Sequence, residues 1–173
     1  ASGLLNDWSG LGSGCGLVLV DQNQADKIVA LRSIGFDLLG ILMRHSIWAG
    51  YPTGVTTRPA DFRPRTMSLG CVNEATARAT PAGVTFLSDE GVFNFSAYSV
   101  ECISTEINSL LLPLDYTQLQ NYSATFLPKR NRYVLKTPTD VWIYEFPAAD
   151  ITTQAVKGRW LRRGVAVDNV IAF

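Results

Sequence analysis

The residues that could carry out acid–base or nucleophilic chemistry are few and scattered. The chain has one histidine, His45 in "MRHSIW", so a Ser-His-Asp triad would have to be built on it. Asp89 and Glu90 in "SDEG" are adjacent in an expected turn, and we expect them to point apart into solvent rather than to face each other across a pocket. His45 falls on a corresponding turn and is interpreted as solvated. We predict no catalytic residues and a protein that is not an enzyme.

The cysteines and glycines do not form recognisable ligand sets. Cys15, Cys71 and Cys102 include no C-x-x-C pair, whereas a zinc site needs three or four closely spaced N or S ligands. We interpret each cysteine as a small buried apolar residue in a chain made in a reducing compartment. The stretch "GLGSGCG" (10–16) resembles a nucleotide-binding loop, but no strand precedes it and no helix follows it. We predict no metal and no cofactor.

Basic residues gather in three places that could contact phosphates. They are Arg58, Arg63 and Arg65 in a Pro-rich connector, Lys129, Arg130 and Arg132 in a turn, and Lys157, Arg159, Arg162 and Arg163 around Trp160. One hypothesis is that these residues face passing DNA or an acidic partner subunit, since cations beside an aromatic ring bind phosphates and stack on bases. The alternative is solvated turns that balance acidic patches. The chain has 15 basic and 15 acidic residues, which argues against an autonomous, tight nucleic-acid binder.

The elements that must position these side chains are predicted to be strands. The chain has 173 residues, 47% hydrophobic and 17% charged, which is enough for one sizeable globular domain. Short runs such as "VTFL", "VFNFS", "RYVLK" and "VWIYEF" are rich in β-branched and aromatic residues and alternate with turn residues. Residues 25–36 fit a short helix or a strand, and residues 104–115 fit a short helix or a loop. The sequence predicts an all-β protein with no membrane anchor.

An internal repeat organises these strands. "LGILMRHSIW" (39–48) aligns with "VTFLSDEGVF" (84–93) at an offset of 45 residues, and "YVLKTPTDVWIY" (133–144) fits again. A repeat of this length with three or four strands is typical of a β-propeller blade, whereas a sandwich or meander would share the spacing only by coincidence. The alignment predicts core positions for Trp48 and Phe93.

We predict about three blades, approximately at 28–72, 73–122 and 123–163. A Gly-rich opening segment or loop with a first strand precedes them at 1–27, and a further strand begins before residue 173. Three blades cannot close a ring of at least four. We therefore expect an incomplete propeller, a fragment of a larger chain, or copies that supply one another's missing contacts.

The sequence resembles propeller-like structural proteins of tailed bacteriophages over roughly residues 28–163. The resemblance rests on "SIW" with "PTG" (Ser46–Trp48 and Pro52–Gly54), on Gly70-Cys71, on the hairpin Gly83–Phe93 and on Ile103–Ile107. "YSATFLPKRNRYVL", "VWIYEF" and "GRWLRR" continue the same pattern.

The resemblance implies a virion structural protein, a tail hub, nozzle or neck subunit that forms part of the DNA-ejection conduit. It implies a homo-oligomeric ring, commonly six-fold, with the portal or adaptor and other tail proteins as partners and transient non-specific contact with double-stranded DNA. The expected location is the tail or neck of the virion, after assembly in the host cytoplasm. The alternative from a different class is a carbohydrate-binding or glycan-hydrolysing β-propeller domain.

Overall fold

The computed structural model describes residues 26–35, 37–55, 58–97, 99–147 and 158–164. In this part of the chain, twelve strands form three antiparallel sheets of four strands each. The predicted all-β class is therefore confirmed. The opening segment expected at 1–27 lies outside the described residues except for Asp26 and Lys27, and the further strand expected near the C-terminus lies outside them entirely.

The first sheet consists of β1 (Ile28–Ile34), β2 (Leu38–Met43), β3 (Ile47–Val55) and β4 (Arg58–Thr66), in that order. Within the ambiguous stretch 25–36, the described residues Ile28–Ile34 form strand β1. Ala30 and Ile34 are buried on one face of the sheet, whereas Leu31 is exposed on the other. The expected Pro-rich connector is an edge strand, β4, and this prediction was wrong. Proline is tolerated there because an edge strand leaves some backbone N–H groups without a sheet partner.

The second sheet consists of β5 (Arg78–Thr80), β6 (Gly83–Ser88), β7 (Gly91–Phe95) and β8 (Val100–Cys102). The third consists of β9 (Ser123–Leu127), β10 (Arg132–Lys136), β11 (Asp140–Glu145) and β12 (Arg159–Gly164). Short helices occupy the connections: η1 (Glu74–Thr76), α1 (Asn108–Leu111), η2 (Tyr116–Asn121) and η3 (Pro128–Arg130). The stretch 104–115 therefore contains a one-turn helix and otherwise loop.

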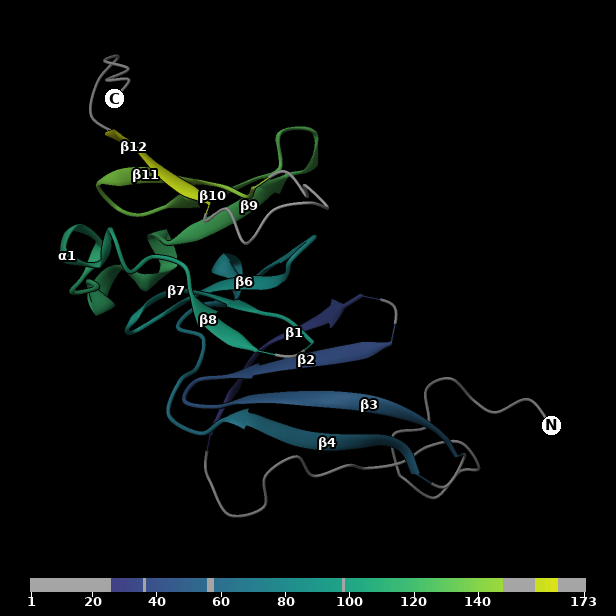
Figure 1. Cartoon of the computed structure of the whole chain (residues 1–173). Coiled ribbons are helices and arrows are strands. Elements are labelled where there is room, and N and C mark those ends of the chain that lie inside the picture. The colour runs from purple at the N-terminus through teal and green to yellow at the C-terminus, as the bar shows by residue number, and fades with distance from the viewer. Residues whose placement is uncertain (1–25, 36, 56–57, 98, 148–157, 165–173) are drawn as a thin grey trace, which may run out of the picture.

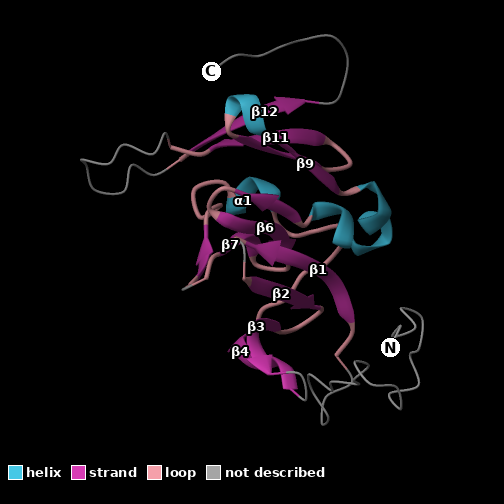
Figure 2. Ribbon diagram, turned by 90° about the vertical axis from the view of Figure 1, so that its right-hand side faces the viewer, coloured by secondary structure: helices cyan, strands magenta, loops and turns pink. Residues whose placement is uncertain are grey.

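The three sheets lie in a stack, with the second sheet between the other two (Figures 1 and 2). Within each sheet, strands that follow one another in sequence are neighbours, so each sheet is a simple up-and-down meander. The first strands of the sheets lie nearest one another, because β5 contacts both β1 and β9. The fourth strands β4, β8 and β12 are edge strands of their sheets.

The strand registers show that the three sheets are structural repeats. Ile41 pairs with Trp48, Phe86 with Phe93, and Leu135 with Trp142, each on the second and third strands of its sheet. The alignment of 39–48 with 84–93 and 133–144 is therefore confirmed at the level of individual positions. These registers allow each residue of one sheet to be compared with its equivalent in the next.

Two hydrophobic cores fill the spaces between the sheets. The core between the first and second sheets contains Leu42 and Ile47 together with Phe86, Phe93 and Phe95. The core between the second and third sheets contains large, buried side chains from both: Leu87, Val92, Tyr133, Leu135, Trp142 and Tyr144. Side chains alternate along each strand, so the second sheet contributes one face to each core.

Four burial predictions can be compared with the structure. Phe93 is buried as expected, but Trp48 is only half-buried, because its face of the first sheet points away from the second sheet. Cys71 is buried as expected, but Cys102 is exposed on the short edge strand β8. Cys15 lies outside the described residues.

Candidate functional site

The turn at Asp89 joins two sheets and a neighbouring helix. Arg44, in the β2–β3 turn, donates from both guanidinium nitrogens to the two carboxylate oxygens of Asp89, at 2.7 and 2.9 Å. The Tyr116 hydroxyl, from η2, donates to the same carboxylate at 2.7 Å. Burial alone would raise the pKa of Asp89, but the hydrogen bonds from Arg44 and Tyr116 outweigh it and the pKa is lowered. The expectation that Asp89 points into solvent was wrong, because an arginine of the preceding repeat reaches it.

Two arginines on first strands repeat one contact from sheet to sheet. Arg32 Nε on β1 donates to the carbonyl of Ala77 at 3.1 Å, and Arg78 Nε on β5 donates to the carbonyl of Ala124 at 2.7 Å. Each arginine also donates from Nη1 to the carbonyl of the residue that precedes it, Leu31 or Ala77. We call these two contacts the arginine clamps. They join the first strand of each sheet to the start of the next sheet, in addition to the apolar core.

The first group of predicted basic residues lies along β4. Arg63 Nε donates to Asp61 at 3.0 Å, and Arg65 donates to the carbonyl of Ala97 in the second sheet at 3.0 Å. Both guanidinium groups lie over the ring of Tyr51, at 5.5 and 5.6 Å from its centroid. The side chain of Arg58 lies outside the described residues, although its backbone begins β4. Arg63 and Arg65 are therefore engaged with the protein itself.

The third sheet holds the other predicted basic residues, and several of them form ion pairs. Arg132 and Arg159 both bind Glu145 from neighbouring strands. Arg162 binds both oxygens of Asp140, at 2.8 and 3.0 Å. The hydrogen bond from Arg159 is the chief cause that lowers the pKa of Glu145, and the hydrogen bond from Arg162 is the chief cause that lowers the pKa of Asp140.

Among the predicted basic residues, three are exposed and have neither an ion pair nor a side-chain hydrogen bond in the described part of the chain. They are Lys129 and Arg130 in η3 and Arg163 on β12. Lys157 lies outside the described residues. The predicted groups do not form one basic surface, because β4 and β12 lie at opposite ends of the stack (Figure 1). The structure does bring Arg132 and Arg159 together, on either side of Glu145.

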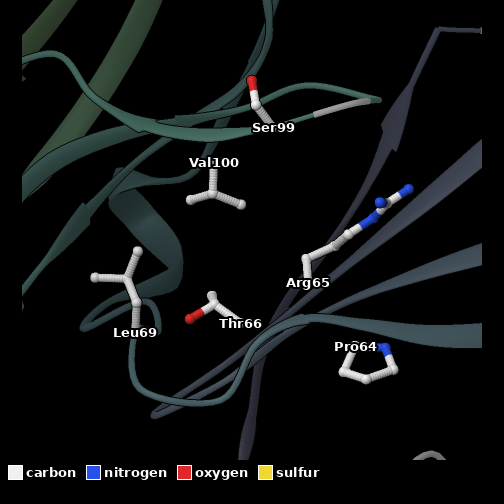
Figure 3. A pocket seen from close by; sticks show the side chains of 6 residues that line it. All are labelled: Pro64, Arg65, Thr66, Leu69, Ser99 and Val100. Carbon is white, nitrogen blue, oxygen red and sulfur yellow. The ribbon is translucent and has the colours of Figure 1, made fainter.

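A cavity of about 290 Å³ opens between the edge strand of the first sheet and the second sheet. Figure 3 shows the six side chains around it: Pro64, Arg65, Thr66, Leu69, Ser99 and Val100. Among the described residues that line it, Arg65 is the only charged one, and it already donates to Ala97. These lining residues include the hydroxyls of Thr66 and Ser99 but no carboxylate or imidazole that could activate them.

Two further cavities contain carboxylates. One, of about 210 Å³, lies beside Trp142 and is lined by Asp115 and Asp140. Asp115 accepts hydrogen bonds from Thr117 and caps η2, while Asp140 binds Arg162. The other, of about 310 Å³, lies between the second and third sheets. Its lining includes Glu101, Glu106, Cys102, Tyr144 and Phe146.

Neither His45 nor Cys71 is placed for nucleophilic chemistry among the described residues. His45 is exposed in its turn, and its backbone N–H donates to Asp26. Burial raises the pKa of the Cys71 thiol to about 11, so the thiolate that acts as a nucleophile is scarce near neutrality. No group of three or more His, Cys, Asp and Glu side chains in the described part could hold a metal ion.

Sequence reasoning missed the contacts that join the repeats, although their spacing was visible. Arg44 and Asp89 are 45 residues apart, the same as the repeat offset, and Arg32 and Arg78 are 46 apart. Opposite charges separated by one repeat length predict a contact between neighbouring repeats. When Asp89 is compared only with its neighbours in sequence, the prediction is a solvated turn.

Comparison with known proteins adds no family to this description. No protein-family model matches the chain, and no curated protein matches it. Among the helices of the described part, none is long and apolar enough to cross a membrane.

Proposed function

We propose that the chain is a structural, non-enzymatic part of a virion, a subunit of the tail hub, nozzle or neck of a tailed phage. The observation that carries this proposal is that polar side chains form hydrogen bonds between neighbouring sheets. The arginine clamps and the Arg44–Asp89 pair all join one sheet to the next. A chain that uses its buried and half-buried polar groups to fix repeat to repeat is suited to building a rigid body.

The stack of four-stranded meanders supports a propeller-like arrangement for this part. Each sheet turns an apolar face to its neighbour and brings its first strand closest to the next sheet, as blades do around a central axis. The sequence resemblance supplies the rest of the proposal: a homo-oligomeric ring in the tail or neck, in contact with the portal or adaptor. Assembly takes place in the host cytoplasm.

A conduit role agrees with the balance of charge. The chain has equal numbers of acidic and basic residues, and most of its described arginines are paired. DNA passing such a surface is held weakly, because tight binding requires many cations free to neutralise phosphates. We propose that contact with double-stranded DNA is transient and independent of sequence.

Immuno-electron microscopy of phage particles tests this proposal. Cells that carry the gene would be induced to release particles, and the particles would be labelled with antibodies raised against the recombinant chain. We expect the label at the tail or neck and the chain among the proteins of purified particles. Particles that lack the chain, or a chain found only outside particles, would overturn the proposal.

The alternative function, a carbohydrate-binding or glycan-hydrolysing domain, is favoured by one feature. The cavity beside the buried Trp142 is lined by two carboxylates, Asp115 and Asp140, the kind of pair that glycoside hydrolases use. A glycan array probed with the wild-type chain and with Asp115→Asn decides between the two. Glycan binding or hydrolysis that Asp115→Asn abolishes, with the fold retained, would replace the structural proposal by the carbohydrate one.

A further inference from the structure

The first sheet carries on its far face the same kind of surface that the other two sheets bury. We define this far face, which points away from the second sheet, by Leu31, Leu39, Ile41, Trp48 and Phe62. By register, Ile41 and Trp48 correspond to Phe86 and Phe93 and to Leu135 and Trp142, which face the preceding sheet in the two cores.

Exposure shows that the outer part of this face is less covered than its equivalents, whereas Ile41 at its centre is buried, with 2% of its surface exposed. Leu39 is 39% exposed, whereas its equivalents Val84 and Tyr133 are 0% exposed. Leu31 is 50% exposed, and none of the described sheets packs on this face. A hollow of about 420 Å³ lies on it beside Leu39, Gly50 and Pro52. A partly exposed apolar face is a candidate interaction surface.

The third sheet has a far face of different character. Its middle row, Val134, Ile143 and Leu161, is aliphatic and runs across three strands. Lys136 pairs with Val141 on one side of this row, and Arg163 follows on β12. Lys136 is equivalent by register to Leu42 of the first sheet and Leu87 of the second. Each of these leucines is buried between its own sheet and the next, opposite a face that carries aromatic residues.

The two far faces complement each other when the internal stacking is repeated between two molecules. In that geometry, the aliphatic row of the third sheet faces the exposed side chains of Leu31 and Leu39. Lys136 lies over Trp48, where its stem covers apolar surface and its ammonium group faces the indole ring.

Charges of opposite sign also lie at corresponding ends of the two far faces. Asp37 borders the hollow on the first sheet, at the β1–β2 turn. Arg132 and Arg159 lie at the corresponding end of the third sheet, where both bind Glu145, so that these three groups together carry one net positive charge. Within the chain, equivalent turns of neighbouring sheets already lie next to each other, as the hydrogen bond from Arg44 of the β2–β3 turn to Asp89 of the β6–β7 turn shows.

We propose that the far face of the first sheet docks on the far face of the third sheet of a second copy of this chain. The contact joins two different surfaces, so it is head-to-tail, and such contacts close into rings or extend into filaments. The inference rests on the proposed function only for the existence of a homo-oligomer, and it names the two surfaces that form it.

Complementation between two variants tests the docking. Leu39→Glu places a charge on the far face of the first sheet and leaves the third sheet intact. The double variant Lys136→Glu with Arg163→Glu reverses the charge of the third sheet and leaves the first intact. All three residues are exposed, so folding is preserved, and circular dichroism with thermal melting verifies this.

We expect native mass spectrometry to show an oligomer for the wild-type chain and a monomer for each variant alone. An equimolar mixture of the two variants should give a one-to-one dimer that grows no further, because one good contact remains. The matched control is Lys129→Glu with Arg130→Glu, which has the same change of charge in η3 and should keep the wild-type mass.

Three outcomes would overturn the proposal. The first is a wild-type chain that stays monomeric at the highest soluble concentration. The second is an oligomer that survives either variant. The third is a pair of monomeric variants that do not combine. None of these outcomes bears on whether virions contain the chain, so failure of the docking is distinguishable from failure of the virion role.

Discussion

At the scale of single residues, Asp89 is the side chain whose role the structure changes most. It accepts two hydrogen bonds from Arg44 and one from Tyr116, and its side chain is still 36% exposed. Solvent weakens an ion pair of this kind, so its contribution is on the order of 1 kcal/mol and no larger than a few. The residue acts as a tether between two sheets and not as an acid.

We predict that Asp89→Asn lowers the free energy of unfolding by about 1 kcal/mol at neutral pH. The pKa of Asp89 is lowered in the folded state from its ordinary value of 3.8, so the stabilisation is present above that value and is lost as the pH falls through the folded pKa. The difference between wild type and variant, measured by urea unfolding across acidic pH, should shrink accordingly. Glu90→Gln in the same turn is the control, and an equal effect of both variants would contradict the tether.

The aromatic pair Phe93 and Trp48 gives a second prediction at this scale. They occupy equivalent positions, but Phe93 is buried between two sheets and Trp48 is half-buried on the far face. We expect Phe93→Ala to cost about 3–5 kcal/mol of stability, and Trp48→Ala to cost clearly less in a monomer. Chemical unfolding under conditions that keep the chain monomeric measures both, and equal costs would argue against the assignment of the two faces.

At the scale of elements, the sheets are joined by both apolar cores and directed polar contacts. Apolar burial holds two faces together but has little directionality, whereas a hydrogen bond fixes a particular pair of atoms. The Arg32 and Arg78 clamps therefore specify how far one first strand is displaced along the next. Arg78 Nε lies 2.7 Å from the carbonyl oxygen of Ala124, and its Nη1 lies 2.9 Å from that of Ala77.

We predict that Arg78→Ala lowers the free energy of unfolding by about 2 kcal/mol, because two charge-assisted hydrogen bonds are lost. Arg78→Lys should recover only part of this, since an ammonium group cannot reproduce the fork of donors. Arg130→Ala in η3, at an exposed cation with no ion pair among the described residues, is the matched control and should change stability by less than about 0.5 kcal/mol. Thermal melts of the three variants make the comparison, and a loss for Arg130→Ala as large as for Arg78→Ala would exclude the clamp.

At the scale of the whole molecule, the stack has two different ends. One end presents the uncharged far face of the first sheet, and the other presents an aliphatic row flanked by lysine and arginine. In repeat proteins, terminal repeats commonly carry a polar outer face that keeps the array soluble. The polar end here is also the end that holds most of the predicted basic residues, so any contact with DNA is expected on the third sheet.

We predict weak binding of double-stranded DNA that disappears as salt is raised. The logarithm of the binding constant falls with the logarithm of salt by about 0.9 for each phosphate neutralised. Lys129→Ala with Arg130→Ala should reduce this slope by about 1–2, because both cations are exposed and unpaired among the described residues. Fluorescence anisotropy with a labelled duplex measures the slope at several salt concentrations.

The control for this measurement is Arg132→Ala with Arg159→Ala. It removes the same number of charges, but both arginines already bind Glu145, so the slope should change less. A slope that neither double variant alters would show that DNA does not contact this sheet.

The sequence by itself determined the strands, the turns and the repeat. Alternation of apolar residues, turn residues at regular spacing and the recurrence of an aromatic at Trp48, Phe93 and Trp142 are local patterns, and local patterns depend on neighbours in the chain. The same reasoning failed for residues 58–66, because proline is a poor strand residue in general and only its place at the sheet edge makes it acceptable.

Only the tertiary structure decided which side chains meet across repeats and which faces are covered. Arg44 reaches Asp89, and Arg78 reaches Ala124, because stacking brings residues one repeat apart within hydrogen-bond distance. Trp48 and Phe93 are alike in sequence position, yet one is half-buried and the other buried, because the second sheet has neighbours on both faces. Burial depends on what lies opposite a residue in space, and a single strand does not carry that information.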